Sequence, residues 1–193
     1  YRRDLVSIPE WNANRLGLWV YGNRTNSVHW TFHEISIRPL PSDKGIVQSG
    51  STPWTELFNG QNWDGWSGKK DGGRIESGGA LSDQAGTLFV PFAHREFEIE
   101  GDLLTSTNGN GGIFFLTGLN ASKGYELALI GSGRMGSGGI YTGGLFAPHE
   151  SFKTAERVSP SKSLIKDDTW TPFRIHVTQD LITTWIAGTK AVE

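Results

Sequence analysis

The stretch Val28-His29-Trp30-Thr31-Phe32-His33-Glu34-Ile35-Ser36-Ile37-Arg38-Pro39-Leu40 decides the fold predicted for this chain. Apolar residues alternate with polar ones from 28 to 32, which is the period-two pattern of a half-buried β-strand. Ile35 and Ile37 have the opposite parity, so one extra residue near His33-Glu34 is needed to keep all the apolar side chains on one face. The stretch therefore predicts a long strand with a β-bulge near its middle.

A second predicted strand covers residues 16–22 and precedes the first across a turn rich in Gly and Asn. Together the two strands are typical of the closing hairpin of a β-sandwich, yet they stand at the front of the chain. Residues 57–66, by contrast, are typical of the opening of such a domain. We therefore expect a closing hairpin over residues 1–41, a linker rich in Ser, Gly and Pro over residues 42–53, and a sandwich domain over residues 54–193.

The displaced hairpin has three explanations that the sequence leaves open. The domain is circularly permuted, or the hairpin is exchanged between subunits, or it is the tail of a preceding repeat in a tandem protein. A sheet that lacks its last strands has an open edge, which promotes aggregation. In each explanation, a hairpin with a sequence like residues 16–40 covers this edge. The expected partners therefore include a second copy of the chain, forming a homo-oligomer by strand exchange, or a neighbouring repeat domain.

The rest of the chain also alternates with period two, and many of its 26 glycines punctuate the predicted strands. Strands are predicted at residues 72–81 (as a hairpin), 86–90, 97–102, 112–117, 125–130, 173–177 and 182–186. Helical periodicity is confined to a turn or two at residues 148–156. Many short strands at regular spacing predict an all-β protein, an antiparallel β-sandwich of the jelly-roll kind.

The composition limits the function classes. A length of 193 residues suits one domain with a real core, and a formal net charge of −2 gives no electrostatic footprint for nucleic acid. No apolar stretch is long enough to span a bilayer, so no membrane insertion is expected. The chain has no cysteine, which excludes disulfides, thiolate metal sites and thiolate nucleophiles.

A series of motifs follows in a fixed order beyond the linker. They are Leu57-Phe58-Asn59-Gly60 with Trp63-Asp64-Gly65-Trp66, Ile75-Glu76-Ser77-Gly78-Gly79-Ala80-Leu81, Phe97-Glu98-Ile99-Glu100, Gly109-Asn110-Gly111-Gly112-Ile113-Phe114-Phe115, Gly124-Tyr125-Glu126-Leu127-Ala128-Leu129, Gly138-Gly139-Ile140-Tyr141 and Asp168-Thr169-Trp170-Thr171. In this order they resemble the 3-keto-disaccharide hydrolase domain family over residues 55–193. The resemblance implies a concanavalin-A-like (lectin/glucanase) sandwich fold, carbohydrate as the partner, and hydrolysis of 3-keto-glycosides. It also implies a bacterial protein that is secreted, periplasmic or extracellular.

The same resemblance places the family's last two strands at residues 16–22 and 28–40. On the central strands, this chain departs from the family pattern at three places. Gly111 stands where a small polar residue is usual, Leu116-Thr117 where an Arg is common, and Ala128 where a Gln is common. These replacements remove polar residues from the central concave face. A non-catalytic carbohydrate-binding module, or a strand-exchanging structural module of a larger extracellular protein, is therefore the alternative to a hydrolase.

Hydrolysis of a 3-keto sugar needs a base, because the C3 ketone acidifies the hydrogen on C2 and its removal expels the group at C1. Glu126 is the predicted base: its strand is otherwise apolar, so it should face a partly dry surface where desolvation raises its pKa. The alternative is a structural carboxylate bonded to Arg134, Arg174 or a backbone amide. His149, in a predicted loop, is the candidate general acid or ligand, and a solvent-exposed loop histidine is the alternative.

Four residues make up the predicted substrate-binding set. Trp63 and Tyr141 offer aromatic faces for a sugar ring, with burial in the core as the alternative. Asn110 and Arg134 add polar groups. The alternating carboxylates of Glu96-Phe97-Glu98-Ile99-Glu100-Gly101-Asp102 resemble a catalytic strand of some sandwich glucanases, but a strand with one wet face has the same spacing.

No cofactor is predicted, and Ca²⁺ is the alternative. Two loops, Asn108-Gly109-Asn110-Gly111 and Lys69-Lys70-Asp71-Gly72, are rich in Asn, Asp and Gly. Calcium takes six to eight oxygen ligands, and neither loop supplies a full set from its side chains. Tight turns are the expected structure of both loops.

Overall fold

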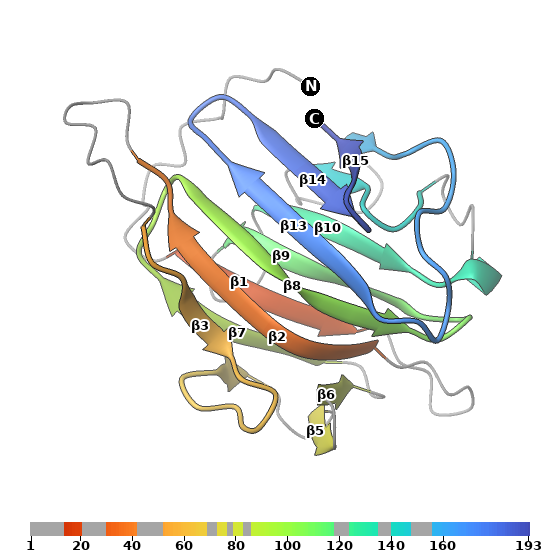
Figure 1. The fold of residues 1–193 in the computed structure, drawn as a ribbon, viewed down its shortest axis with the longest axis horizontal. Coiled ribbons are helices and arrows are strands. Elements are labelled where there is room, and N and C mark those ends of the chain that lie inside the picture. Colours follow the sequence, from red (N-terminus) through yellow and green to blue (C-terminus); the bar gives the residue numbers. More distant parts are fainter. Residues whose placement is uncertain are drawn as a thin grey trace.

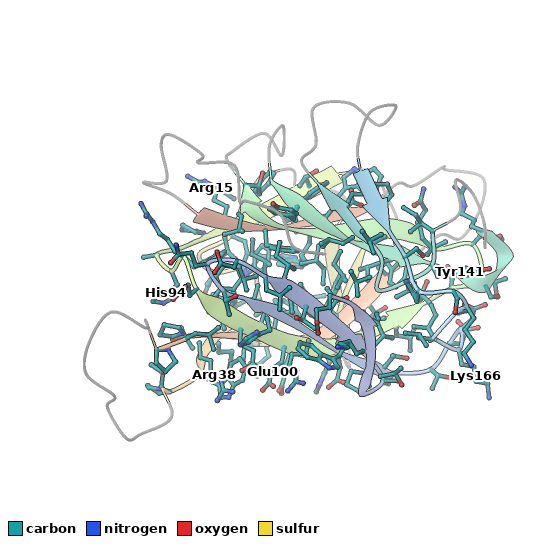
Figure 2. All side chains as sticks on the ribbon, turned by 90° about the horizontal axis from the view of Figure 1, so that it is seen from above. Arg15, Arg38, His94, Glu100, Tyr141 and Lys166 are labelled. Atoms are coloured by element: carbon teal, nitrogen blue, oxygen red, sulfur yellow. The ribbon has the colours of Figure 1, made fainter. Side chains whose placement is uncertain are left out.

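The computed structural model describes residues 14–20, 30–41, 52–68, 73–76, 79–82, 86–117, 124–134, 140–147 and 156–193. These residues form two β-sheets, named sheet A and sheet B (Figure 1). Figure 2, turned by 90° from Figure 1, shows the two layers with side chains packed between them. Every strand pair in the described residues is antiparallel. The predicted all-β antiparallel sandwich is therefore confirmed.

The order of the strands sets the position of every side chain considered below. Sheet A runs β12 (Glu156–Val158), β11 (Leu145–Ala147), β10 (Tyr125–Ile130), β9 (Asn110–Thr117), β1 (Asn14–Val20), β7 (Gly86–Phe92), β4 (Ser67–Gly68). Sheet B runs β15 (Thr189–Val192), β14 (Ile182–Ile186), β13 (Thr171–Val177), β8 (Phe97–Thr105), β2 (Trp30–Pro39), β6 (Gly79–Ser82), β5 (Gly73–Glu76), and β3 (Thr55–Phe58) also pairs with β2. One short 3₁₀ helix, η2 (Ser132–Arg134), follows β10.

The two N-terminal strands do not form the predicted closing hairpin. β1 lies in sheet A between β7 and β9, whereas β2 lies in sheet B between β6 and β8. They also fill the middle of the two sheets rather than an edge (Figure 1). An alternating pattern specifies which face a strand buries but not the sheet to which it belongs, so the sequence did not separate these arrangements. Pairing within one chain is what a permuted sandwich requires, and exchange between copies or with a neighbouring repeat stays a prediction.

The bulge predicted in the deciding stretch is confirmed. The register of β2 against β8 shifts between Phe32 and Ile35. Because of this shift, Trp30, Phe32, Ile35 and Ile37 are all buried in the core. In a strand without the extra residue, the two isoleucines would face solvent.

The core lies between the sheets, and both N-terminal strands contribute to it. Leu16 on β1 and Trp30 on β2 have no exposed surface. Burial of one large apolar side chain contributes about 1.5–3 kcal/mol to folding. The N-terminal strands are therefore part of the hydrophobic core that residues 54–193 need.

Most other predicted strands are present. The predicted hairpin at residues 72–81 corresponds to the pair β5–β6, and the strands predicted at 173–177 and 182–186 correspond to β13 and β14, which pair with each other. Residues 148–155, which cover most of the possible helical turn, lie outside the described residues, and Glu156–Val158 forms strand β12 instead of continuing such a turn.

β9 carries a second bulge that shapes the outside of sheet A. Its register against β1 shifts between Arg15 and Gly17, and Leu116 adopts a left-handed conformation with φ 53°. As a result, Phe115 and Leu116 both belong to the core. On the N-terminal side of the bulge, the side chains of β9 alternate regularly, so Gly112 and Phe114 face away from the core.

Candidate functional site

The face of sheet A that points away from the core presents two rows of residues across β1, β9 and β10. Leu18 of β1, Ile113 of β9 and Leu127 of β10 belong to the core, so their neighbours along each strand point outward. The register aligns these neighbours into one row of Trp19, Gly112 and Ala128 and a second row of Gly17, Phe114 and Glu126. These six residues are named the outer A face.

The side chain of Glu126 extends from the row of Gly17 and Phe114 toward Gly112 in the other row. A Cβ atom added to Gly112 would lie only 2.2 Å from Glu126 Oε1, so the carboxyl group rests directly on this glycine. Gly112 is the Cα partner of Trp19 on β1 and of Ala128 on β10. Glu126 and Trp19 therefore flank the same glycine on the outer A face.

The carboxyl group of Glu126 is almost completely removed from water. Its residue is 3% exposed, and this burial raises the pKa of Glu126 from the ordinary 4.5 to about 8. Desolvation is the cause, because it destabilises the charged form of the carboxyl group. The burial and the direction of the pKa shift that the apolar strand predicted are both found. An ionised carboxylate with such a pKa is a stronger base than an ordinary glutamate.

Trp19 and Arg15 of β1 border this site, and neither is among the site residues predicted from the sequence. Trp19 is half-buried, and its ring packs on Phe114 with 6.2 Å between the ring centroids. Arg15 has the same parity, and Figure 2 shows it on the sheet A side of the molecule. The available signal was parity: both residues alternate with the core residues Leu16 and Leu18, which places them on the opposite face.

Three other predicted site residues gather at the far end of β10. Asn110 is the Cα partner of Ile130, the last residue of β10. Arg134 lies in the 3₁₀ helix that follows, and Tyr141 precedes a threonine whose hydroxyl bonds both backbone groups of Ile130. Glu126 is four residues from Ile130, on the order of 13 Å along a strand. The structure thus brings Asn110, Arg134 and Tyr141 to one end of sheet A, away from Glu126.

The last two predicted site residues lie elsewhere. Trp63 is in the turn between β3 and β4, where its ring stacks on Phe58 at 4.7 Å and meets Trp66 edge-on at 5.5 Å. It is half-buried against the core, and its role in substrate binding stays a prediction. His149 lies outside the described residues.

The outer face of sheet B holds a carboxylate in a different setting. Glu98 is 5% exposed, and its Oε2 accepts a hydrogen bond from Arg38 Nε at 2.8 Å and a second one from Arg38 Nη2. Arg174 Nη1 lies 3.5 Å from Glu98 Oε1, so Arg174 serves the opposite sheet and is not the partner of Glu126. Tryptophan rings support both guanidinium groups, Trp54 under Arg38 at 4.5 Å and Trp185 under Arg174 at 4.1 Å.

An open groove with a volume of ≈ 390 Å³ crosses the same outer face of sheet B. Glu100 and Asp102 of β8 line it together with Arg174 and Trp185. Burial and the neighbouring charge of Glu98 raise the pKa of Glu100. Figure 2 shows Glu100 and Arg38 on this side of the molecule. Carboxylates can accept hydrogen bonds from the hydroxyl groups of a sugar, and an aromatic ring can pack on its apolar face. The lining of this groove therefore also fits a sugar.

The described residues contain no group of three His, Cys, Asp or Glu side chains that could hold a metal ion. Calcium therefore stays a prediction of the sequence. In the same residues, no helix has the length and apolar character that a membrane crossing requires.

Comparison with known proteins gives one match. The model of a family described as the 3-keto-alpha-glucoside-1,2-lyase-like domain matches residues 53–193, which confirms the resemblance seen in the motifs. The match indicates a carbohydrate-active domain. It includes β9 and β10 but neither β1 nor β2. Neither the curated proteins nor the solved structures contain a match.

Proposed function

We propose that this chain, which belongs to the family of 3-keto-alpha-glucoside-1,2-lyase-like domains, cleaves the glycosidic bond of 3-keto-glucosides with Glu126 as the catalytic base. One observation carries the proposal: a carboxyl group with a pKa of about 8 lies on the outer A face, where desolvation alone accounts for the shift. Perturbed carboxyl groups of this kind are concentrated at catalytic sites.

The reaction follows from the chemistry of a C3 ketone. The carboxylate of Glu126 takes the proton from C2, and the electron pair of that C–H bond passes into an enolate. A double bond then forms between C1 and C2 as the bond from C1 to the leaving oxygen breaks and the ketone returns. Water adds across this double bond and gives the free 3-keto sugar. The proton that Glu126 removed passes to the leaving oxygen, directly or through water, so the carboxylate is regenerated and atoms and charge balance.

Ionisation of Glu126 sets the pH dependence of this reaction. Only the ionised carboxylate removes a proton, and with a pKa of about 8 most molecules carry a protonated Glu126 at neutral pH. We therefore expect kcat/KM to rise with pH and to level off above about pH 8. An ordinary glutamate would give a flat profile across the neutral range.

The test uses p-nitrophenyl 3-keto-α-glucoside, whose leaving group needs no general acid. Replacing Glu126→Gln should lower kcat by about 10²–10⁴-fold, the usual effect of removing a general base. Glu100→Gln, on the opposite sheet, is the matched control and should retain activity. The corresponding glucoside without the ketone should not be cleaved. Retention of full activity in Glu126→Gln would exclude Glu126 as the base.

A second candidate function is non-catalytic carbohydrate binding, and the sheet B groove favours it. This groove has the size of a ligand site and combines Trp185, Arg174 and two carboxylates. Under this alternative, the wild-type protein binds glycans in calorimetry but releases no product from the 3-keto probe. Trp185→Ala and Glu100→Gln would then weaken binding, whereas Glu126→Gln would not.

A further inference from the structure

We propose that β1 supplies the sugar-binding wall of the Glu126 site, with Trp19 as the surface on which the sugar ring stacks and Arg15 as a donor to a sugar oxygen. This inference rests on the proposed function, because it gives that same site its substrate contacts. β1 lies outside residues 53–193, which match the family. The contacts therefore come from the N-terminal segment of this chain.

Trp19 and Glu126 lie close together on the outer A face. Both side chains flank Gly112 on the outer A face, since Trp19 is the Cα partner of this glycine and the carboxyl group of Glu126 rests on it. Neighbouring strands are about 4.7–4.9 Å apart. Glycine and Ala128 add almost no bulk to this row. A sugar ring against Trp19 thus lies within reach of the carboxyl group.

The two residues differ in their exposure to solvent. Trp19 is half-buried, whereas Glu126 is 3% exposed. Trp19 is therefore the more exposed residue of the pair, and the carboxyl group of Glu126 lies deeper. The apolar C–H face of a sugar packs well on a flat aromatic ring, and such a contact orients the C2 hydrogen relative to a fixed base.

Arg15, on the same strand, carries a buried hydrogen-bond donor. Arg15 lies two residues from Gly17 and faces outward with the same parity as Trp19. Its Nε atom is buried and makes no hydrogen bond within the described residues. A buried donor without an acceptor is unfavourable, so it calls for an acceptor that the described residues do not provide. A hydroxyl or carbonyl oxygen of the sugar is such an acceptor.

The other tryptophans of the described residues are placed differently. Trp30 and Trp66 are buried in the core, and guanidinium groups cover Trp54 and Trp185. Trp63 is half-buried in the turn between β3 and β4, where it stacks on Phe58. Trp170 is 42% exposed, but it adjoins His33 of β2 with ring centroids 5.8 Å apart and so belongs to the sheet B side. Trp170 is therefore the matched control for an exposed indole outside the site.

The experiment measures kcat and KM of the full-length protein with p-nitrophenyl 3-keto-α-glucoside. We expect Trp19→Ala to raise KM about tenfold, equal to ~1.4 kcal/mol of lost contact, with kcat within about twofold. Trp19→Phe should recover most of the affinity, because it keeps an aromatic face. Trp19→Leu keeps the bulk without that face, and it replaces Trp19→Ala if the latter does not fold. Arg15→Gln should raise KM about fivefold.

Two results would overturn the proposal. One is a KM within twofold of wild type for both Trp19→Ala and Trp19→Leu. The other is an equal rise in Trp170→Ala, which would show a nonspecific effect of removing an indole.

A binding measurement separates this inference from the proposed function. Calorimetry of the same probe with Glu126→Gln, alone and combined with Trp19→Leu, reports affinity without turnover. If the wild-type protein binds the probe but releases no p-nitrophenol, the catalytic proposal fails, and a tenfold weaker Kd in the double variant still supports the role of Trp19. An unchanged Kd in the double variant contradicts that role whatever the activity.

Discussion

The two outer faces of the sandwich each bury a glutamate, and they do so in opposite ways. On sheet B, Glu98 is held by the guanidinium groups of Arg38 and Arg174. On sheet A, Glu126 lies against Gly112 in a row of glycine, aromatic and alanine positions, and desolvation raises its pKa to about 8. Cations compensate the first charge, whereas burial in the second case favours the neutral acid.

This difference distinguishes a carboxylate held by two arginines from the carboxyl group that we propose as the catalytic base. Glu98 is fixed by partners on β2 and β13, so removing one member of the cluster leaves an uncompensated group on a crowded face. A desolvated acid such as Glu126 gains basicity once it ionises, and this property is useful to a proton-abstracting enzyme.

The largest expected effect is on the pH dependence of stability. The pKa of Glu126 is raised in the folded state, so the folded state binds more protons than the unfolded state between about pH 4.5 and pH 8. The corresponding stability is fully present below about pH 4.5 and is lost as pH rises through about 8, by up to about 1.4 kcal/mol per pH unit. Urea unfolding at several pH values should show this slope in the wild type and in Glu98→Gln. The contrast breaks if Glu126→Gln keeps the slope.

The next effect is steric. Gly112→Ala places a Cβ atom 2.2 Å from Glu126 Oε1, so the carboxyl group must move out of its buried position. We expect a loss of about 2 kcal/mol in the free energy of unfolding, as for other overpacked sites. In a Glu126→Ala background the same substitution should cost clearly less, because the clashing group is gone. Equal costs in both backgrounds would show that the carboxyl group does not rest on Gly112.

The smallest effect concerns the compensated carboxylate. Glu98→Gln keeps the size of the side chain but removes the charge that faces Arg38 and Arg174. Because both arginines are partly exposed, we expect a loss of only about 1 kcal/mol in the free energy of unfolding at neutral pH. Glu126→Gln should instead leave stability at pH 8 unchanged or higher. If the free energy of unfolding at pH 8 changed in the same direction in both variants, the distinction between the two faces would be contradicted.

The sequence was sufficient for the fold class and for the local features of strands. The parity change between Phe32 and Ile35 predicted the β2 bulge, because only an extra residue keeps both apolar sets inside. The strands that pair with β1 and β2 could not be predicted from the sequence. Their alternation specifies a buried face, but which strands lie beside them depends on contacts between residues far apart in the chain.

The candidate site was predicted in part. An acidic residue in the apolar strand β10 indicated a buried carboxyl group with a raised pKa, and the structure has both. The neighbours of Glu126 were not predicted, because Trp19 and Gly112 meet it only through the register of β1 against β9. Asn110 and Tyr141 were selected by residue type, and the length of β10 separates them from Glu126.

The most direct test of the account is the titration of the Glu126 carboxyl group itself. In protein labelled with ¹³C at glutamate, the resonance that is missing from Glu126→Gln belongs to this side chain, and its chemical shift can be followed from about pH 3 to pH 10. We expect a midpoint near pH 8. A midpoint near 4.5 or below would contradict it, because Glu126 would then be an ordinary solvated or ion-paired carboxylate.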